Sequence, residues 1–281
     1  MRVRVPASSA NLGPGFDALA IALDIPIEVS ITPSDTLELS AEGFGSELTD
    51  PAEHLGVQLA TEILGHQRFA LHIRSEIPLA RGLGSSAALA IAVAQAAGSP
   101  DALAVGTRVD GHAENAAASL FGGLVTASVE EGEIFVASLP LDPALKFVVV
   151  IPDRELATAD ARRVLPSTVS YHDAAFNLSR VALLTAGLAD HTRLLATAMD
   201  DRLHQPYRMG LLPFAADVLS VGREAGALAT CWSGAGSTML AVVTDATAQL
   251  VCDATNDVLI RHGEPGVVRI VDADRQGLRV L

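Results

Sequence analysis

The sequence is short of cysteine, and this excludes a disulfide framework. Its only cysteines are Cys231 and Cys252, and no C-x-x-C pair is present. Small folds stabilised by disulfides need several cysteines, and the usual zinc and redox motifs need closely spaced ones. We therefore interpret both residues as reduced structural thiols.

Long apolar runs are also missing. The most apolar helix candidate, residues 87–97, is too short to span a bilayer. The first residues, Met1 to Val5, alternate charged and apolar side chains, which is typical of a strand and not of a signal peptide. The sequence therefore predicts a cytoplasmic protein with no membrane partner.

Basic residues are scarce. The chain has 19 Lys and Arg residues against 33 Asp and Glu residues, and its formal net charge is −14. A nucleic acid partner is excluded on this balance, because neutralising backbone phosphates needs a basic surface. One phosphorylated small ligand remains compatible with the composition, because its site needs positive potential only locally.

The apolar residues that are present indicate helices packed on sheets. They make up 49% of 281 residues, whereas aromatic residues make up only 4%. Periodicity and turn signals predict strands at 27–31, 37–39, 69–73, 124–129, 134–139, 146–151, 227–231, 239–243 and 267–271, and helices at 51–65, 85–97, 115–121, 158–163, 171–189, 191–198, 212–225 and 249–261. We expect an α+β fold of two domains, residues 1–145 and 146–281.

A Gly-Ser loop between a strand and a helix is the strongest functional signal. It reads Gly82-Leu83-Gly84-Ser85-Ser86-Ala87. Two glycines let backbone approach a ligand closely, and the helix start directs free N–H groups and positive dipole at it. The two serine hydroxyls offer further donors or a Mg²⁺ ligand, and Arg81 offers charge. The loop therefore predicts a phosphate-binding site.

Other readings of this loop fit less well. A Rossmann turn needs an acidic residue at a strand end about 20 positions on, and none is present near residue 104. A Walker loop needs a lysine, but Lys146 is the only lysine in the chain, and a G-x-S-x-G nucleophile elbow is absent. An ordinary Gly-Ser turn that caps a helix remains the plain alternative.

Four segments resemble motifs of one family. Residues 78–88, PLARGLGSSAA, resemble the central motif of the kinases that phosphorylate galactose, homoserine, mevalonate and phosphomevalonate, the GHMP kinases. Residues 6–17, PASSANLGPGFD, resemble the homoserine kinase branch, as do residues 203–208, LHQPYR. Residues 233–236, SGAG, are similar to the third family motif. The resemblance implies an N-terminal domain like ribosomal S5 domain 2 and a C-terminal ferredoxin-like α/β sandwich.

The resemblance implies ATP and L-homoserine as ligands. The residues implied for ATP are Pro78, Leu79, Ala80, Arg81, Gly82, Leu83, Gly84, Ser85, Ser86, Ala87 and Ala88, with His54 where an adenine-contacting Asn is usual. Those for the amino acid are Asn11, Asp17, His112, Asn115, Thr158, Arg162, Arg208 and Gly234. Arg162 and Arg208 suit a carboxylate clamp, because a guanidinium offers two parallel donors. Thr158 lies one helical turn before Arg162 and would steady it.

The catalytic and metal residues are less sharply implied. We expect Asn11, Asn115 and Glu114 close to the reacting hydroxyl, and Ser86 and Asp110 as Mg²⁺ ligands. Arg108 stands where the family pattern has the metal-binding glutamate. Three explanations stay open: Asp110 binds the metal instead, the register differs, or metal use is impaired.

The implied activity is transfer of the ATP γ-phosphate to the hydroxyl of L-homoserine, giving O-phospho-L-homoserine for threonine biosynthesis. Phosphoryl transfer depends on positioning and charge stabilisation rather than on a covalent protein intermediate. The alternatives are a sibling kinase for another small carboxylated alcohol and a nucleotide-binding homologue with impaired catalysis. The family also makes a homodimer one of the arrangements to test.

Overall fold

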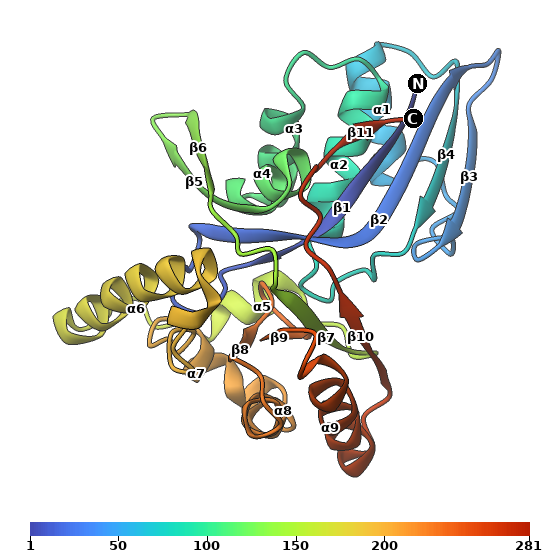
Figure 1. The fold of residues 1–281 in the computed structure, drawn as a ribbon. Helices are drawn as coiled ribbons and strands as arrows, with labels where there is room; N and C mark the ends of the chain where they lie inside the picture. Colours follow the sequence, from blue (N-terminus) through green and yellow to red (C-terminus); the bar gives the residue numbers. More distant parts are fainter.

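The computed structural model describes residues 1–281, which form two sheets covered by helices (Figure 1). The first part contains β1 (Arg2–Ala10), β2 (Leu19–Pro33), β3 (Glu38–Gly43), α1 (Leu55–Leu64), β4 (Phe69–Ser75), α2 (Ser85–Ala96), α3 (Ala102–Asp110), α4 (Ala113–Phe121), β5 (Leu124–Glu130) and β6 (Glu133–Leu139). The second contains β7 (Lys146–Pro152), α5 (Thr158–Arg163), α6 (Tyr171–Ala189), η1 (His191–Arg193), α7 (Gln205–Arg208), η2 (Met209–Leu211), α8 (Ala215–Glu224), β8 (Ala229–Trp232), β9 (Met239–Val243), α9 (Ala248–His262), β10 (Gly266–Val271) and β11 (Arg279–Val280). The predicted α+β architecture is confirmed.

The larger sheet has seven strands. Its main path is β11-β1-β2-β4-β3, with β5 beside β2 and β6 beside β5. Every pair is antiparallel except β3 with β4. The 15-residue strand β2 pairs with β5 at its start and with β4 at its end, so it runs through both parts of the sheet.

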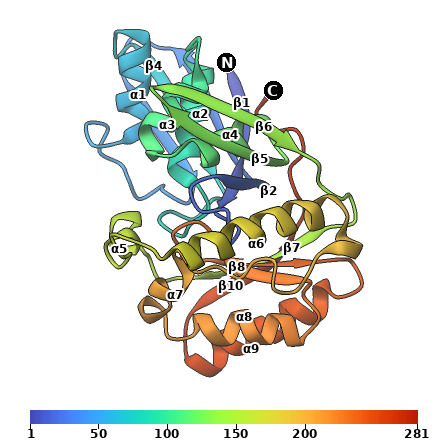
Figure 2. The ribbon, with the colours of Figure 1, turned by 90° about the vertical axis from the view of Figure 1, so that its left-hand side faces the viewer.

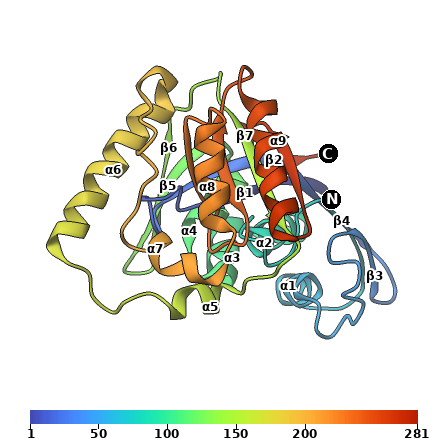
Figure 3. The same cartoon turned by 90° about the horizontal axis from the view of Figure 1, so that it is seen from below.

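The smaller sheet has the antiparallel order β10-β7-β9-β8, and α8 and α9 lie side by side over one of its faces (Figure 3). Strand β7 is apolar on both faces, as its uninterrupted run of β-branched residues predicts. Phe147, Val149 and Ile151 face the main core, whereas Val148 and Val150 face the helices. This alternation places the smaller sheet between two hydrophobic layers.

One hydrophobic core runs through both parts of the chain. Its 43 buried residues include Val5 and Leu23 of the larger sheet together with Phe147 and Leu240 of the smaller one. Figure 2 shows the two helix-covered sheets stacked one above the other with α6 along the junction. The loops at this junction are therefore held between two packed layers.

Helix α2 is the central element under the larger sheet. Almost every residue from Ala87 to Ala96 is buried, and most of these residues are alanine. Alanine allows neighbouring elements to approach closely on all sides, and it is also the best helix former. The helix start at Ser85 is consequently held in a fixed position.

Several expected element bounds are wrong. The helix expected at 51–65 begins at Leu55, with the His54 side chain accepting from the N–H of Gly56. The expected helix at 191–198 is only the short turn η1, and no helix was expected at α3 or α7. Strand β2 is also three times as long as the expected strand at 27–31.

The chain end returns to the first sheet. β11 pairs with β1, and the N–H of Leu281 donates to the carbonyl oxygen of Arg2 over 2.9 Å, so the two termini lie side by side (Figure 1). The expected division at residue 145 coincides with the start of β7, but it stays a prediction. No helix in the structure has both the length and the apolar character needed to cross a membrane.

Candidate active site

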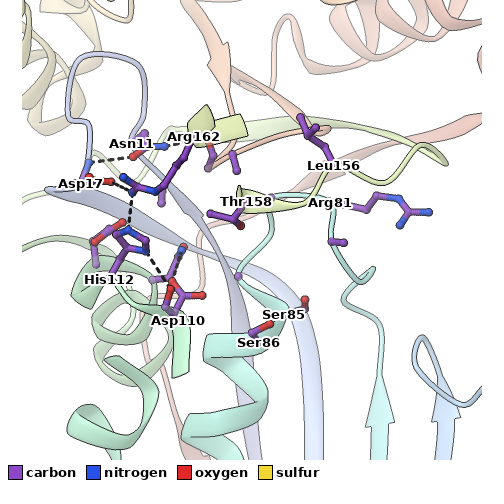
Figure 4. Close-up of a pocket in the computed structure, with 18 of the residues that line it drawn as sticks. Asn11, Asp17, Arg81, Ser85, Ser86, Asp110, His112, Leu156, Thr158 and Arg162 are labelled. Carbon is purple, nitrogen blue, oxygen red and sulfur yellow. Dashed lines mark hydrogen bonds and ion pairs between the residues drawn. The ribbon is translucent and has the colours of Figure 1, made fainter. Parts of the chain in front are cut away.

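A polar cavity of about 190 Å³ lies where the loops of both parts meet (Figure 4). It collects sixteen of the residues expected from the sequence: Asn11, Asp17, Ala80, Arg81, Gly82, Gly84, Ser85, Ser86, Asp110, His112, Glu114, Asn115, Thr158, Arg162, Arg208 and Gly234. Segments far apart in the sequence thus converge on one space. We take this cavity as the candidate active site.

The start of α2 opens onto the cavity without a cap of its own. Gly84 is the N-cap residue with φ of 64°, and no side chain accepts a hydrogen bond from the first turn. That turn also contains no acidic residue. Its free N–H groups and positive dipole end therefore face the cavity in a form that suits an anion.

Tight packing against distant residues requires both loop glycines. A Cβ on Gly82 would lie 2.2 Å from the carbonyl oxygen of Ser233, and one on Gly84 would lie 2.1 Å from Oγ of Ser8. Both glycines also have positive φ, which a side chain would strain. The Ser233 hydroxyl in turn donates to the carbonyl oxygen of Gly82 over 2.6 Å. The Gly-rich turn after β8 therefore buttresses the phosphate loop.

Arg81 anchors this loop rather than facing the cavity centre. Its guanidinium donates to the carbonyl oxygens of Leu79, Pro152 and Asp153 and forms an ion pair with Glu155. In Figure 4 the side chain points away from Ser85 and Ser86. The charge expected from Arg81 is thus largely engaged by the end of β7.

Two arginines form a cationic wall opposite the loop. Arg162 of α5 donates to Oδ1 of Asp17 over 2.6 Å and contacts Nε2 of His112 (Figure 4). Arg208 of α7 is 1% exposed, and its Nη1 donates to the carbonyl oxygen of Gly234 over 2.9 Å. Burial and then the neighbouring charge of Arg162 lower the pKa of Arg208 to about 10. Two guanidinium groups on the same cavity wall favour the binding of an anion between or beside them.

Thr158 also lies on this wall and Leu156 borders it, both from the segment that follows β7. A buried Nε of Arg162 has no hydrogen-bond partner within the protein. Eight other buried side-chain atoms of the chain share this feature, and this Nε is closed to solvent, so it is not a donor to the cavity. The part of Arg162 that a ligand can reach is the 35% of its side chain that is exposed.

The loop between β1 and β2 is strained around Asn11. Asn11, Leu12 and Asp17 have φ of 70°, 48° and 55°, values that are uncommon for residues with a side chain. Nδ2 of Asn11 donates to the carbonyl oxygen of Gly234 over 2.8 Å, and its Oδ1 accepts from the N–H of Asp17 over 3.0 Å. The Asn11 amide therefore fastens this loop to the turn after β8. Such strain, held by surrounding structure, is common in binding sites.

Acidic residues at the α3–α4 junction form the third side of the cavity. Burial raises the pKa of Glu114 to about 7. Burial also raises the pKa of Asp110, while a hydrogen bond from Asn115 and the nearby charges of His112 and Arg162 oppose that rise. Nδ2 of Asn115 donates to Asp110 over 3.0 Å, and its Oδ1 accepts from the Ser8 hydroxyl over 2.9 Å. The amide of Asn115 is thus oriented by both neighbours.

The oxygen donors present fit a hard cation. Asp110 supplies a carboxylate and Ser86 an exposed hydroxyl, both on the cavity wall, and oxygen is what Mg²⁺ prefers. No group of three or more His, Cys, Asp or Glu side chains is arranged to hold a metal in the whole chain. Mg²⁺ commonly keeps waters and phosphate oxygens, so a small protein donor set is compatible with it.

Arg108 lies outside the cavity. Its Nη2 pairs with Oε1 of Glu62 on α1 over 2.8 Å, and both side chains are more than half exposed. The charge at the unusual sequence position thus faces solvent, whereas Asp110, at the last turn of the same helix, lines the site.

The other expected nucleotide residues do not line the cavity. Leu83, Ala87 and Ala88 are buried in the core, and Pro78 and Leu79 precede the loop. His54 is 5% exposed and borders a separate hollow formed by residues 47–54. Burial lowers its pKa. Its expected role at adenine stays a prediction.

Three lining residues were not anticipated. They are Ala10, Leu156 and Ala235. Ala10 and Ala235 lie within residues 6–17 and 233–236, so the motifs that contain them could have indicated their position. Leu156 carries no motif, and the hydrogen bond from its N–H to the carbonyl oxygen of Ala80 places it there.

Comparison with known proteins gives a consistent result. Residues 52–123 match the model described as GHMP kinases N terminal domain, and residues 182–260 match GHMP kinases C terminal. The chain is 33% identical to a homoserine kinase from Desulfitobacterium hafniense over the full length of both. It is 39% identical to a homoserine kinase from Moorella thermoacetica over 85% of this chain and 86% of the other.

Solved structures agree in fold. The crystal structure of homoserine kinase from Cytophaga hutchinsonii superposes with a TM-score of 0.86 at 26% identity, covering 100% of this chain and 97% of the other. L. major mevalonate kinase, at 15% identity, superposes with a TM-score of 0.73 and shares the fold. The predicted two-domain GHMP fold is confirmed, and the chain belongs to the GHMP kinase family.

Proposed function

We propose that the protein transfers the γ-phosphate of ATP to the hydroxyl of L-homoserine. The observation that carries this proposal is one cavity with the uncapped start of α2 on one side and two arginines on the other. The first feature suits a polyphosphate, and the second suits the carboxylate of an amino acid. A relative that matches this chain over its full length is a homoserine kinase.

The cavity offers a complementary group for each end of homoserine. Arg162 and Arg208 both line the cavity and would hold the carboxylate through their guanidinium groups. Asp17 is an acceptor close to these arginines and would hold the ammonium. With both ends held, the hydroxyl would reach toward Glu114 and the phosphate loop. Holding two reactants in this way supplies much of the rate enhancement in phosphoryl transfer.

Glu114 is the residue that would move a proton. The residue is 3% exposed, and its pKa of about 7 keeps a large share of the carboxyl group ionised at neutral pH. An acceptor with a pKa near the working pH is well matched to removing the hydroxyl proton. The γ-phosphate would meanwhile stay at the N–H groups of Ser85 and Ser86. The positive end of the helix dipole lies there and would stabilise the negative charge of the phosphate. Mg²⁺ at Asp110 and Ser86 would neutralise phosphate charge when bound.

Release of ADP, measured with and without L-homoserine, tests this proposal. We expect ADP only with the amino acid present, and much less with 4-hydroxybutyrate, which lacks the ammonium group. Phosphorylation of another hydroxy acid in preference to homoserine would favour a sibling kinase. ATP binding by calorimetry without turnover in excess Mg²⁺ would favour a nucleotide-binding homologue, the reading suggested by Arg108.

We also infer three properties beyond the activity: a domain boundary at residue 145, a homodimer as the assembly to test, and a cytoplasmic location. The first is supported by β7 beginning a new sheet at Lys146. Light scattering of the purified chain would measure its mass, and a mass of one chain would contradict the homodimer.

A further inference from the structure

A buried histidine contacts the cationic wall from behind. His204 is 0% exposed, and it lies immediately before α7, the four-residue helix that ends at Arg208. Its Nε2 lies 2.8 Å from the carbonyl oxygen of Gly13, and its Nδ1 lies 3.0 Å from Nη1 of Arg208. One ring therefore bridges the β1–β2 loop and an arginine of the site.

These partners assign the tautomer of His204. A carbonyl oxygen only accepts, so Nε2 must carry the hydrogen; a guanidinium only donates, so Nδ1 must present its lone pair. The imidazole is therefore neutral with hydrogen on Nε2. Burial lowers the pKa of His204 to about 4, which agrees with this state although Asp201 opposes the shift.

The histidine ring also belongs to an aromatic support for both arginines. It stacks on Phe16 with ring centroids 5.0 Å apart and planes 22° from parallel. The guanidinium carbons of Arg162 and Arg208 lie 5.3 Å and 5.5 Å from the centroid of the same Phe16 ring. Cations over an aromatic face are attracted to it, so Phe16 constrains both arginines at once.

The backbone of His204 is fixed independently by a buried carboxylate. Asp201 accepts hydrogen bonds from the N–H groups of Leu203, His204 and Gln205 at 2.7 Å, 2.9 Å and 2.6 Å. It also accepts from Nδ2 of Asn177 over 2.8 Å. This carboxylate sets where α7 starts, and the helix is too short to hold its own position by internal hydrogen bonds.

We propose that His204 is a positioning residue that presets Arg208 for the substrate carboxylate. This inference rests on the proposed function, but it concerns how the clamp is held and not which group is phosphorylated. Without the acceptor at Nδ1, one donor of Arg208 loses its partner in a buried setting, and the guanidinium can turn away. Amino-acid binding then weakens, while the start of α2 and the nucleotide it holds are untouched.

Two substitutions separate the two hydrogen bonds of His204. In His204→Gln the amide nitrogen reaches the place of Nε2, so the bond to Gly13 is kept and the acceptor for Arg208 is lost. In His204→Asn the amide oxygen takes the place of Nδ1, so the acceptor is kept and the bond to Gly13 is lost. His262→Asn is a matched control, because His262 pairs with Asp217 far from the cavity.

The readout is a set of Michaelis constants, which do not depend on how much of a variant is folded. We expect His204→Gln to raise KM for homoserine roughly 3- to 10-fold, the worth of one hydrogen bond. KM for ATP should change less than about twofold, and His204→Asn should raise KM for homoserine less than His204→Gln. An effect of His204→Asn equal to or above that of His204→Gln, or a parallel rise in KM for ATP, would overturn the inference.

A second measurement does not depend on turnover. Nitrogen NMR of the histidine rings, with His204 assigned from the His204→Asn spectrum, should show Nε2 protonated and Nδ1 bare from about pH 5.5 to 8. A ring that takes up a proton in that range, or that carries its hydrogen on Nδ1, would refute the inference. If homoserine is no substrate while the ring has the assigned form, the proposed function fails and the Arg208 contact stands.

Discussion

Replacing Arg162 by alanine tests the carboxylate clamp most directly. Arg162 lines the cavity and donates to Asp17 over 2.6 Å, and its half-buried side chain is placed to receive the carboxylate of a substrate. A hydrogen bond between charged groups contributes about 1.5–3 kcal/mol, which corresponds to roughly 10- to 150-fold in kcat/KM. Because 35% of this side chain is exposed, solvent screening moves the expectation toward about 10- to 30-fold.

The neighbouring residue supplies the control. Arg163 has the same side chain on the same helix, but it is 76% exposed and pairs with Asp160 on the surface. Initial rates should be measured against homoserine and against ATP for Arg162→Ala and Arg163→Ala. We expect the loss to appear in KM for homoserine of the first variant only. A change below roughly threefold in kcat/KM, or an equal loss in both variants, would remove Arg162 from the site.

The remaining predictions concern the loop, the proton and the metal. Gly84→Ala should lower Tm and raise KM for ATP, because its Cβ would lie 2.1 Å from Oγ of Ser8. Gly65→Ala is the control, because Gly65 has a similar φ but nothing within 4 Å of its Cβ position, and equal KM values for ATP in the two variants would contradict the prediction. Wild-type kcat should rise with pH through about 7, because Glu114 accepts a proton only when ionised, and Glu114→Gln should lose this limb. Because the pKa of Glu114 is raised in the folded state, the free energy of unfolding of the wild type falls as the pH rises toward about 7. Glu114→Gln should therefore raise Tm most at high pH, and an equal rise at low pH would refute the buried charge. Asp110→Asn should raise the Mg²⁺ concentration needed for half-maximal rate, and an unchanged requirement would separate Asp110 from the metal.

Sixteen of the expected residues line one cavity, and the sequence pointed to them because each motif is local. The phosphate loop needs two glycines and a helix start, and all three lie within residues 82–86. The convergence of Asn11 with Gly234 is different, because 223 residues separate the two partners of that hydrogen bond. Only the family resemblance suggested that these segments meet, and no periodicity or propensity carries such information.

The length of β2 was missed because proline interrupts its pattern. Pro26 lies inside the strand and faces Pro6 of β1, at the point where the register of the pair shifts. Proline cannot donate to a ladder, so it normally marks an edge or an irregularity. Here the irregularity lets both strands continue past it and carry the Asn11 loop to the site.

Helix α3 was missed for a related reason. Gly106 lies in its middle and lowers helix propensity by about 1 kcal/mol. In the structure a Cβ at this position would lie 2.7 Å from Ile91 of α2, so glycine is what allows the two helices to approach. Packing between helices thus overrides local propensity, and only the three-dimensional neighbours reveal it.

The position of α3 also shows where the charge of Arg108 lies relative to the cavity. Arg108 and Asp110 are two residues apart, so on a helix they cannot face the same side. Asp110 lines the cavity, and Arg108 pairs with Glu62 in solvent. A positive charge at the metal would oppose Mg²⁺ binding, but a charge on the outer face of α3 is screened and does not enter the site. Arg108 therefore adds no cation to the cavity, and we infer that Asp110 is the carboxylate of α3 that would bind Mg²⁺.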